Sequence, residues 1–260
     1  MKPAMMGPIK ENMNNAKSEL KLISPTEKHW LCGGNRSITM AATLLQQGKV
    51  IAVPTDTIYG LAALASDIFA IEQLYEIKKR DEKKPLAICL GNVNDVPHWA
   101  VTDHLPHRLL EDLLPGPYTI ILKRKSCLNP ALNPDTDSVG IRVPNSKFML
   151  NVAKIVGPIA LTSANVSNEP SSVHPDEFSA LWPELSGIFY EISKSRQKLS
   201  DRIGSTVVDL SQPGYYKIVR HGIKFQIISG TLKNAGLKMI TSERREPECE
   251  SRDILKNCEI

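Results

Sequence analysis

Four clusters of polar residues could bind a charged ligand, and each lies beside a short apolar run. The first is the segment 54–61, PTDTIYGL, which places two hydroxyls and a carboxylate directly after the run 50–53. Gly60 in this segment permits a close approach of the backbone to another group. The same residues would also form an ordinary capped turn, so the segment alone does not decide between the two interpretations.

The second cluster is the segment 78–86, KKRDEKKPL, in which cations could converge on phosphate groups. The planar guanidinium of Arg80 offers bidentate contacts, whereas Lys78 and Lys84 act as point charges. Because the helix dipole also stabilises cations at a helix C-terminus, a solvated helix end explains the same run.

The third cluster is the segment 162–165, TSAN, with Ser171 beyond it. Its hydroxyl and amide groups can contact phosphate oxygens or a ribose, and they equally form Asx and Ser turns.

The fourth cluster is spread over three further apolar runs. Arg142 lies between Ile141 and Val143, so in a strand its side chain is on the less apolar face and must find an acceptor or water. A ligand carboxylate would satisfy it, and so would a structural aspartate. The members of this cluster are Ser138, Arg142, Ser205, Thr206 and Arg220.

Alternating helical and extended patterns must position these clusters, which is typical of an α/β protein. Helices are predicted after the capping residues Ser37 and Asp67 and near 105–114, 147–156 and 176–181. Several later strands are too close in sequence for a crossover helix, which favours a twisted mixed sheet flanked by helices. Strands are predicted at 50–53, 86–90, 119–122, 139–143, 159–161, 206–210 and 217–219.

Composition limits the class of protein. The 260 residues are 42% hydrophobic, enough for a core, and 32 basic against 28 acidic residues leave room only for a local cationic pocket. The five cysteines include no CxxC pair, which favours a reducing compartment.

No integral membrane segment or targeting signal is expected, so the cytoplasm is predicted, with a mitochondrial pool left open. Mobile tails are predicted at 1–33 and 231–260, around a domain at 34–230.

The order of the motifs resembles the YrdC/Sua5 family over about residues 36–230. The matching segments are PTDT-x-YGL, K-x-R with KPL, PGP-x-T at 115–119, GIRVP at 140–144, TSAN, GSTVVD at 204–209 and the arginine before Gly222. The resemblance implies a YrdC-like mixed sheet with a concave, positively charged face. It also implies synthesis of threonylcarbamoyl-adenylate and pyrophosphate from L-threonine, bicarbonate and ATP, without a covalent enzyme intermediate. The product would serve the t6A modification of tRNA through a threonylcarbamoyl-transferase complex.

The resemblance also implies roles for individual residues. Lys78 and Arg80 would be catalytic, Mg²⁺ would bridge the phosphates, and no residue is assigned as a metal ligand. ATP would be bound by Lys78, Arg80, Lys84, Ser138, Ser163, Asn165, Ser171 and Arg220. Threonine would be bound by Thr57, Arg142, Thr162 and Thr206.

Two departures and two alternatives remain. Cys89 stands where many relatives carry histidine, and a small buried core residue is expected there. The residues after Gly230 are too few for the second domain that some relatives carry. One alternative is an RNA-binding module, although no aromatic residues interleave with a basic stripe. The other is a related carbamoyl-adenylate domain, which usually belongs to longer chains with zinc-binding cysteines.

Overall fold

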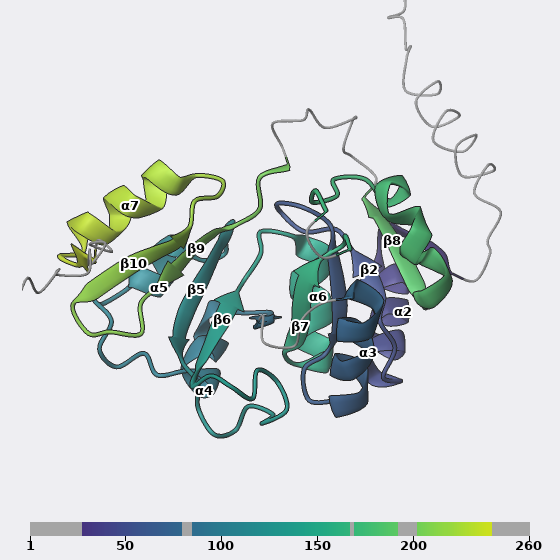
Figure 1. The fold of residues 1–260 in the computed structure, drawn as a ribbon, viewed down its shortest axis with the longest axis horizontal. Helices are drawn as coiled ribbons and strands as arrows, with labels where there is room; N and C mark the ends of the chain where they lie inside the picture. The colour runs from purple at the N-terminus through teal and green to yellow at the C-terminus, as the bar shows by residue number, and fades with distance from the viewer. Residues whose placement is uncertain (1–27, 80–84, 167–168, 192–201, 241–260) are drawn as a thin grey trace, which may run out of the picture.

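One mixed sheet with helices on its faces forms the fold, as the sequence predicts (Figure 1). The computed structural model describes residues 28–79, 85–166, 169–191 and 202–240. Within these residues the strand order is β1-β8-β2-β3-β7-β4-β6-β5-β9-β10-β11. The strands are β1 (His29–Cys32), β2 (Ile51–Val53), β3 (Gly60–Leu64), β4 (Ala87–Cys89), β5 (Tyr118–Lys123), β6 (Ser138–Arg142), β7 (Ile159–Ser163), β8 (Gly187–Glu191), β9 (Thr206–Asp209), β10 (Tyr215–Arg220) and β11 (Lys238–Met239).

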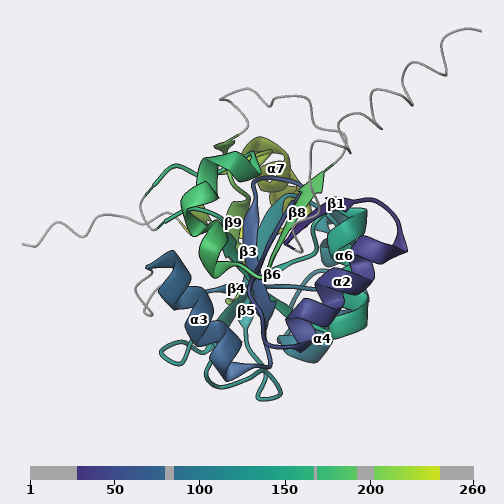
Figure 2. The ribbon, with the colours of Figure 1, turned by 90° about the vertical axis from the view of Figure 1, so that its right-hand side faces the viewer.

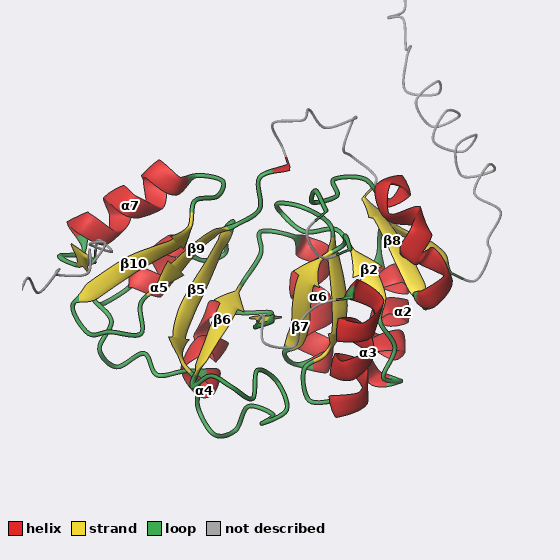
Figure 3. Cartoon of the chain, in the orientation of Figure 1, coloured by secondary structure: helices red, strands yellow, loops and turns green. Residues whose placement is uncertain are grey.

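The sheet contains both parallel and antiparallel strand pairs. β3 pairs antiparallel with β2 and β7, and the short strand β4 pairs antiparallel with β7 and parallel with β6. β5 then pairs antiparallel with β6 and parallel with β9. β4 therefore joins two halves of the sheet, which are also seen as two groups of elements in Figure 3.

Helices cover both faces. In Figure 2, α3 lies on one side of the strands, and α2 and α6 lie on the other. The α-helices are α2 (Asn35–Gln46), α3 (Ile68–Lys78), α4 (Val96–Trp99), α5 (Leu109–Leu113), α6 (Lys147–Val156) and α7 (Phe225–Asn234), and the 3-10 helices are η1 (Val93–Asp95) and η2 (Pro175–Glu184). None of the helices in the described part of the chain is both long and apolar enough to cross a membrane.

Of the two predicted helix caps, one is confirmed. The side chain of Asp67 accepts a hydrogen bond from the Ala70 backbone N–H, as expected for the N-cap of α3. α6 has the predicted bounds, with Ser146 as its N-cap. The prediction of Ser37 as an N-cap is wrong, because α2 begins at Asn35 and the Ser37 hydroxyl donates back to the Gly34 carbonyl.

The structure extends beyond the predicted domain limits of 34 and 230. β1 pairs in parallel with β8, and α7 and β11 continue the fold to Met239, so residues 29–32, 231–234 and 238–239 belong to secondary structure rather than to tails. The segment 176–181 lies in a 3-10 helix that contains Pro183. β3 was not predicted, and it places the segment 54–59 in a loop between two antiparallel strands.

Two groups of buried apolar residues stabilise the sheet. One fills the space between the sheet and the helices α2 and α6, and it includes Met149, Phe189 and Cys89. The other covers the α3 side and continues under β5, β6 and β9. Burial on both faces fixes the strand ends, from which the polar clusters project.

Candidate active site

A pocket of about 530 Å³ lies against one face of the sheet, since alternate residues of β5 and of β6 line it. It draws residues from both halves of the sheet, with β3 and β7 on one side and β5, β6, β9 and β10 on the other. Among the described lining residues, Arg142 and Arg220 carry charge, and both are cationic. The polar lining consists of Thr55, Thr119, Ser138, Arg142, Thr162, Ser163, Ser205 and Arg220.

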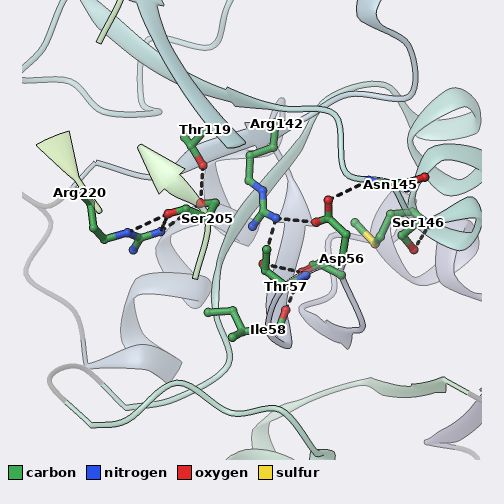
Figure 4. Close-up of polar contacts among 11 residues, drawn as sticks. Asp56, Thr57, Ile58, Thr119, Arg142, Asn145, Ser146, Ser205 and Arg220 are labelled. Atoms are coloured by element: carbon green, nitrogen blue, oxygen red, sulfur yellow. Dashed lines mark hydrogen bonds and ion pairs between the residues drawn. The ribbon is translucent and has the colours of Figure 1, made fainter. Parts of the chain in front are cut away.

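The side chain of Arg142, on β6, is hydrogen-bonded to two residues that do not line the pocket (Figure 4). Its Nη2 donates to Asp56 Oδ1 at 2.9 Å and to Thr57 Oγ1 at 3.1 Å. Its Nε is buried and has no hydrogen-bond partner. Of the two partners left open by the sequence, the structural aspartate is therefore present, and it leaves one buried donor of the guanidinium without a partner.

Arg220 of β10 belongs to a second hydrogen-bonded chain in Figure 4. Its guanidinium donates to the Ser205 carbonyl through Nε at 3.1 Å and Nη2 at 2.8 Å, and Nη2 also reaches Ser205 Oγ at 3.0 Å. Ser205 Oγ lies 2.8 Å from Thr119 Oγ1. These hydrogen bonds link β10, the start of β9 and β5 along one side of the pocket. They fix the position of the exposed side chain of Arg220.

Lys78 at the end of α3 is buried rather than solvated. Its Nζ lies 2.6 Å from the Ser163 carbonyl, 2.8 Å from the Asn165 carbonyl and 3.1 Å from Ser163 Oγ. The ammonium group thus holds together the segment TSAN, of which Thr162 and Ser163 line the pocket. Lys78 does not line the pocket, but it contacts Ser163, which does. A direct contact between Lys78 and a phosphate stays a prediction.

These motifs agree with the comparisons to known proteins. A family model for Sua5, YciO and YrdC proteins, described as telomere recombination, matches residues 43–222. The chain belongs to the Sua5/YciO/YrdC family. A Bos taurus protein named threonylcarbamoyl-AMP synthase is 46% identical over 208 residues, which cover 79% of this chain and 75% of that protein. The Homo sapiens protein of the same name is 45% identical over 204 residues, or 77% of this chain and 72% of that protein.

A solved Sua5 structure shares the fold of this family member. P. abyssi Sua5 complexed with L-threonine superposes with a TM-score of 0.71 at 24% identity, covering 82% of this chain and 62% of that one. This chain therefore matches less than two thirds of that Sua5 chain.

The structure brings together part of the site predicted from the family motifs. Ser138, Arg142, Thr162, Ser163 and Arg220 line the pocket. The remaining predicted residues do not line it: Lys78, Asn165, Thr57, Thr206 and Ser171. Arg80 and Lys84 lie outside the described residues.

Local contacts account for three of the residues outside the pocket lining. Thr57 contacts Arg142, and the fully buried hydroxyl of Thr206 donates to the Ile223 carbonyl. The Asn165 amide donates to the carbonyls of Val166 and Glu169, which closes a local turn. These side chains are engaged within the protein, and their assignment to ATP or threonine remains a prediction.

Sequence reasoning missed the roles of Asp56, Ser205 and Thr119. Asp56 was seen in its motif, and Ser205 in its cluster, but neither was given a role because their partners are distant in sequence. Gly60 permits a close backbone approach, as expected, because a Cβ there would lie 3.1 Å from the Thr162 carbonyl oxygen. The close approach that Gly60 permits includes that of β3 to β7.

Cys89 is a fully buried core residue, as predicted. Burial raises the pKa of its thiol to about 12, so the reactive thiolate is scarce at pH 8. The thiol of Cys127, by contrast, is on an exposed residue.

Iodoacetamide at pH 8 is therefore expected to modify Cys127 and to leave Cys89 intact in the folded protein. Peptide mapping by mass spectrometry measures both sites in one sample, and the same treatment in urea serves as the control in which both react. Equal labelling of the two cysteines in the folded protein would contradict the assignment of Cys89 to the core.

Proposed function

We propose that the chain is a threonylcarbamoyl-AMP synthase that uses L-threonine, bicarbonate and ATP. The observation that carries this proposal is Arg142, a pocket-lining cation with a buried, unpartnered donor, in a chain close in sequence to proteins with that activity in their names. A carboxylate satisfies such a donor, and L-threonine supplies one.

The reaction is a capture followed by an adenylyl transfer. The uncharged amine of threonine attacks CO₂ derived from bicarbonate, and loss of a proton gives N-carboxythreonine. One oxygen of the new carboxylate then attacks the α-phosphorus of ATP, and the bond to the leaving pyrophosphate breaks. Because two anions must meet, most of the catalysis lies in positioning them and in stabilising negative charge at the phosphorus.

Residues of the pocket fit these two tasks. Arg142 would bind the threonine carboxylate, and Thr162 of β7, which also lines the pocket, would be a further threonine contact. Arg220, Ser138 and Ser163 would contact the nucleotide, together with Arg80 and Lys84 of the basic motif. Lys78 would act by holding Ser163 in place.

Mg²⁺ would enter with the phosphates of ATP. The described side chains that line the pocket offer hydroxyls and guanidinium groups but no carboxylate, so oxygen ligands would come mainly from the nucleotide and water. The product would pass to a threonylcarbamoyl-transferase complex that modifies tRNA, in the cytoplasm and in a mitochondrial pool.

Pyrophosphate release provides the test. We expect release from ATP only when both L-threonine and bicarbonate are present, with controls that omit each in turn, the latter in degassed buffer. Formation of threonylcarbamoyl-adenylate is followed by chromatography of the same samples. Pyrophosphate release without threonine, or none under full conditions, would exclude this activity.

A further inference from the structure

The carboxylate of Asp56 supports Arg142 from outside the pocket. Both side chains are only 9% exposed, and Asp56 does not line the pocket. Its Oδ1 accepts from Arg142 Nη2 at 2.9 Å, and its Oδ2 accepts from the Asn145 backbone N–H at 3.0 Å. The carboxylate thus ties the guanidinium to the residue that precedes Ser146, the N-cap of α6, as Figure 4 shows.

A count of hydrogens shows which donors of Arg142 are occupied. Nη2 carries two hydrogens, and Asp56 Oδ1 and Thr57 Oγ1 are acceptors for both. The Thr55 hydroxyl donates to the Ile58 carbonyl at 2.6 Å, so the hydrogen shared by Thr55 and Thr57 comes from Thr57. Thr57 is therefore an acceptor for Arg142, and Nη2 has no hydrogen left for a ligand.

The remaining donors of the guanidinium include Nε, which is buried and unpartnered. A buried arginine needs a counter-charge, because desolvation of an unpaired cation is costly. Asp56 supplies that charge from the side away from the pocket. The side of the guanidinium that lines the pocket is thereby left to an incoming anion.

We propose that Asp56 is a positioning residue for substrate binding: it engages Nη2 of Arg142 and so orients the guanidinium for the carboxylate of L-threonine. This inference rests on the proposed function and adds a residue to it. Asp56 acts through Arg142 and does not touch the substrate. Loss of its charge should therefore affect threonine and spare ATP.

The test compares Asp56→Asn with the native protein by titration calorimetry of L-threonine and of ATP. Asparagine keeps the size of the side chain but has one oxygen for two donors and no charge. We expect the Kd for threonine to rise about tenfold or more, since charge-assisted hydrogen bonds are roughly twice as strong as neutral ones, and the Kd for ATP to change less than about twofold. Asp67→Asn is the matched control, because Asp67 also holds a helix N-terminus but lies in no contact with Arg142.

A double-mutant comparison separates positioning from a purely structural role. In an Arg142→Gln background no guanidinium is left to orient, so adding Asp56→Asn should weaken threonine binding no further. Thermal unfolding of each variant reports the structural contribution, which we expect to be independent of threonine affinity.

The outcomes distinguish the two proposals. Native-like threonine affinity in Asp56→Asn, or equal losses for threonine and ATP, overturns the role of Asp56. Threonine binding by the native protein without any threonine-dependent turnover overturns the proposed activity alone. Absence of threonine binding by the native protein overturns both.

Discussion

Replacement of Arg142 by alanine is expected to raise the KM for L-threonine about 100-fold and to leave the Kd for ATP within a few-fold of the native value. Hydrogen bonds to charged groups contribute about 1.5–3 kcal/mol each, and a loss of about 2.7 kcal/mol corresponds to that factor. Arg142 lines the pocket with a buried, unpartnered Nε, so its removal deletes a donor that no other group replaces. Steady-state kinetics with each substrate varied in turn provide the measurement.

The same change leaves Asp56 buried without its cation, which costs about 3–5 kcal/mol of folding stability for a well-buried pair. Thermal unfolding should therefore accompany the kinetics, and Arg142→Lys serves as a second variant that keeps a charge. Lys147→Ala, which removes an exposed cation on α6, is the matched control and should behave as the native protein. If Arg142→Ala weakened ATP and threonine equally, the assignment of Arg142 to the carboxylate would be wrong.

Replacement of Lys78 by methionine is expected to lower the free energy of unfolding by about 2–4 kcal/mol and to remove most of the activity. Methionine retains the apolar stem, but the Asn165 carbonyl loses its Lys78 donor and the Ser163 carbonyl keeps only the Asn165 backbone N–H. An unsatisfied buried acceptor costs about 1–3 kcal/mol. For a chain of this size such a loss lowers the Tm by roughly 10 °C. Differential scanning calorimetry and the pyrophosphate assay measure the two effects.

The neighbouring Lys79 offers a direct comparison. It is exposed and ends α3 in a left-handed conformation, and Lys79→Met should leave both stability and turnover close to native. A native Tm for Lys78→Met combined with lost activity would show that Lys78 acts on the substrate rather than on the segment TSAN. That result would restore the phosphate contact predicted from the sequence.

The sequence predicts the site residues that lie next to a recognisable apolar run. Ser138, Arg142, Ser163 and Arg220 each end or begin a strand that the sequence marks by an apolar run. Their convergence in one pocket could not be predicted, because Ser138 and Arg142 are opposite ends of β6 and the strand order alone brings β7 and β10 to it. Asp56 could be seen as a carboxylate but not as the partner of Arg142. That contact joins the loop between β2 and β3 to β6, and such a pairing depends on strand order rather than on spacing.

The elements that the sequence missed lack a local signal. β3 reads GLAAL, without β-branched residues, and it is buried on both faces, so no alternation marks it. β11 spans two exposed residues and forms only because β10 is beside it. The burial of Lys78 could not be predicted, because the segment that covers it, 163–165, is supplied by a distant part of the chain.

The three-residue strand β4 is the connection between the two halves of the sheet that line the pocket. Its backbone hydrogen bonds to β7 and β6 join the two halves of the sheet, and the pocket takes its walls from both halves. A substrate that contacts Ser163 on one side and Arg142 on the other therefore acts as a cross-link over this seam. Since a ligand stabilises the state that it binds, occupancy of the pocket should slow amide hydrogen exchange at Ile88 more than at the distant strand β1.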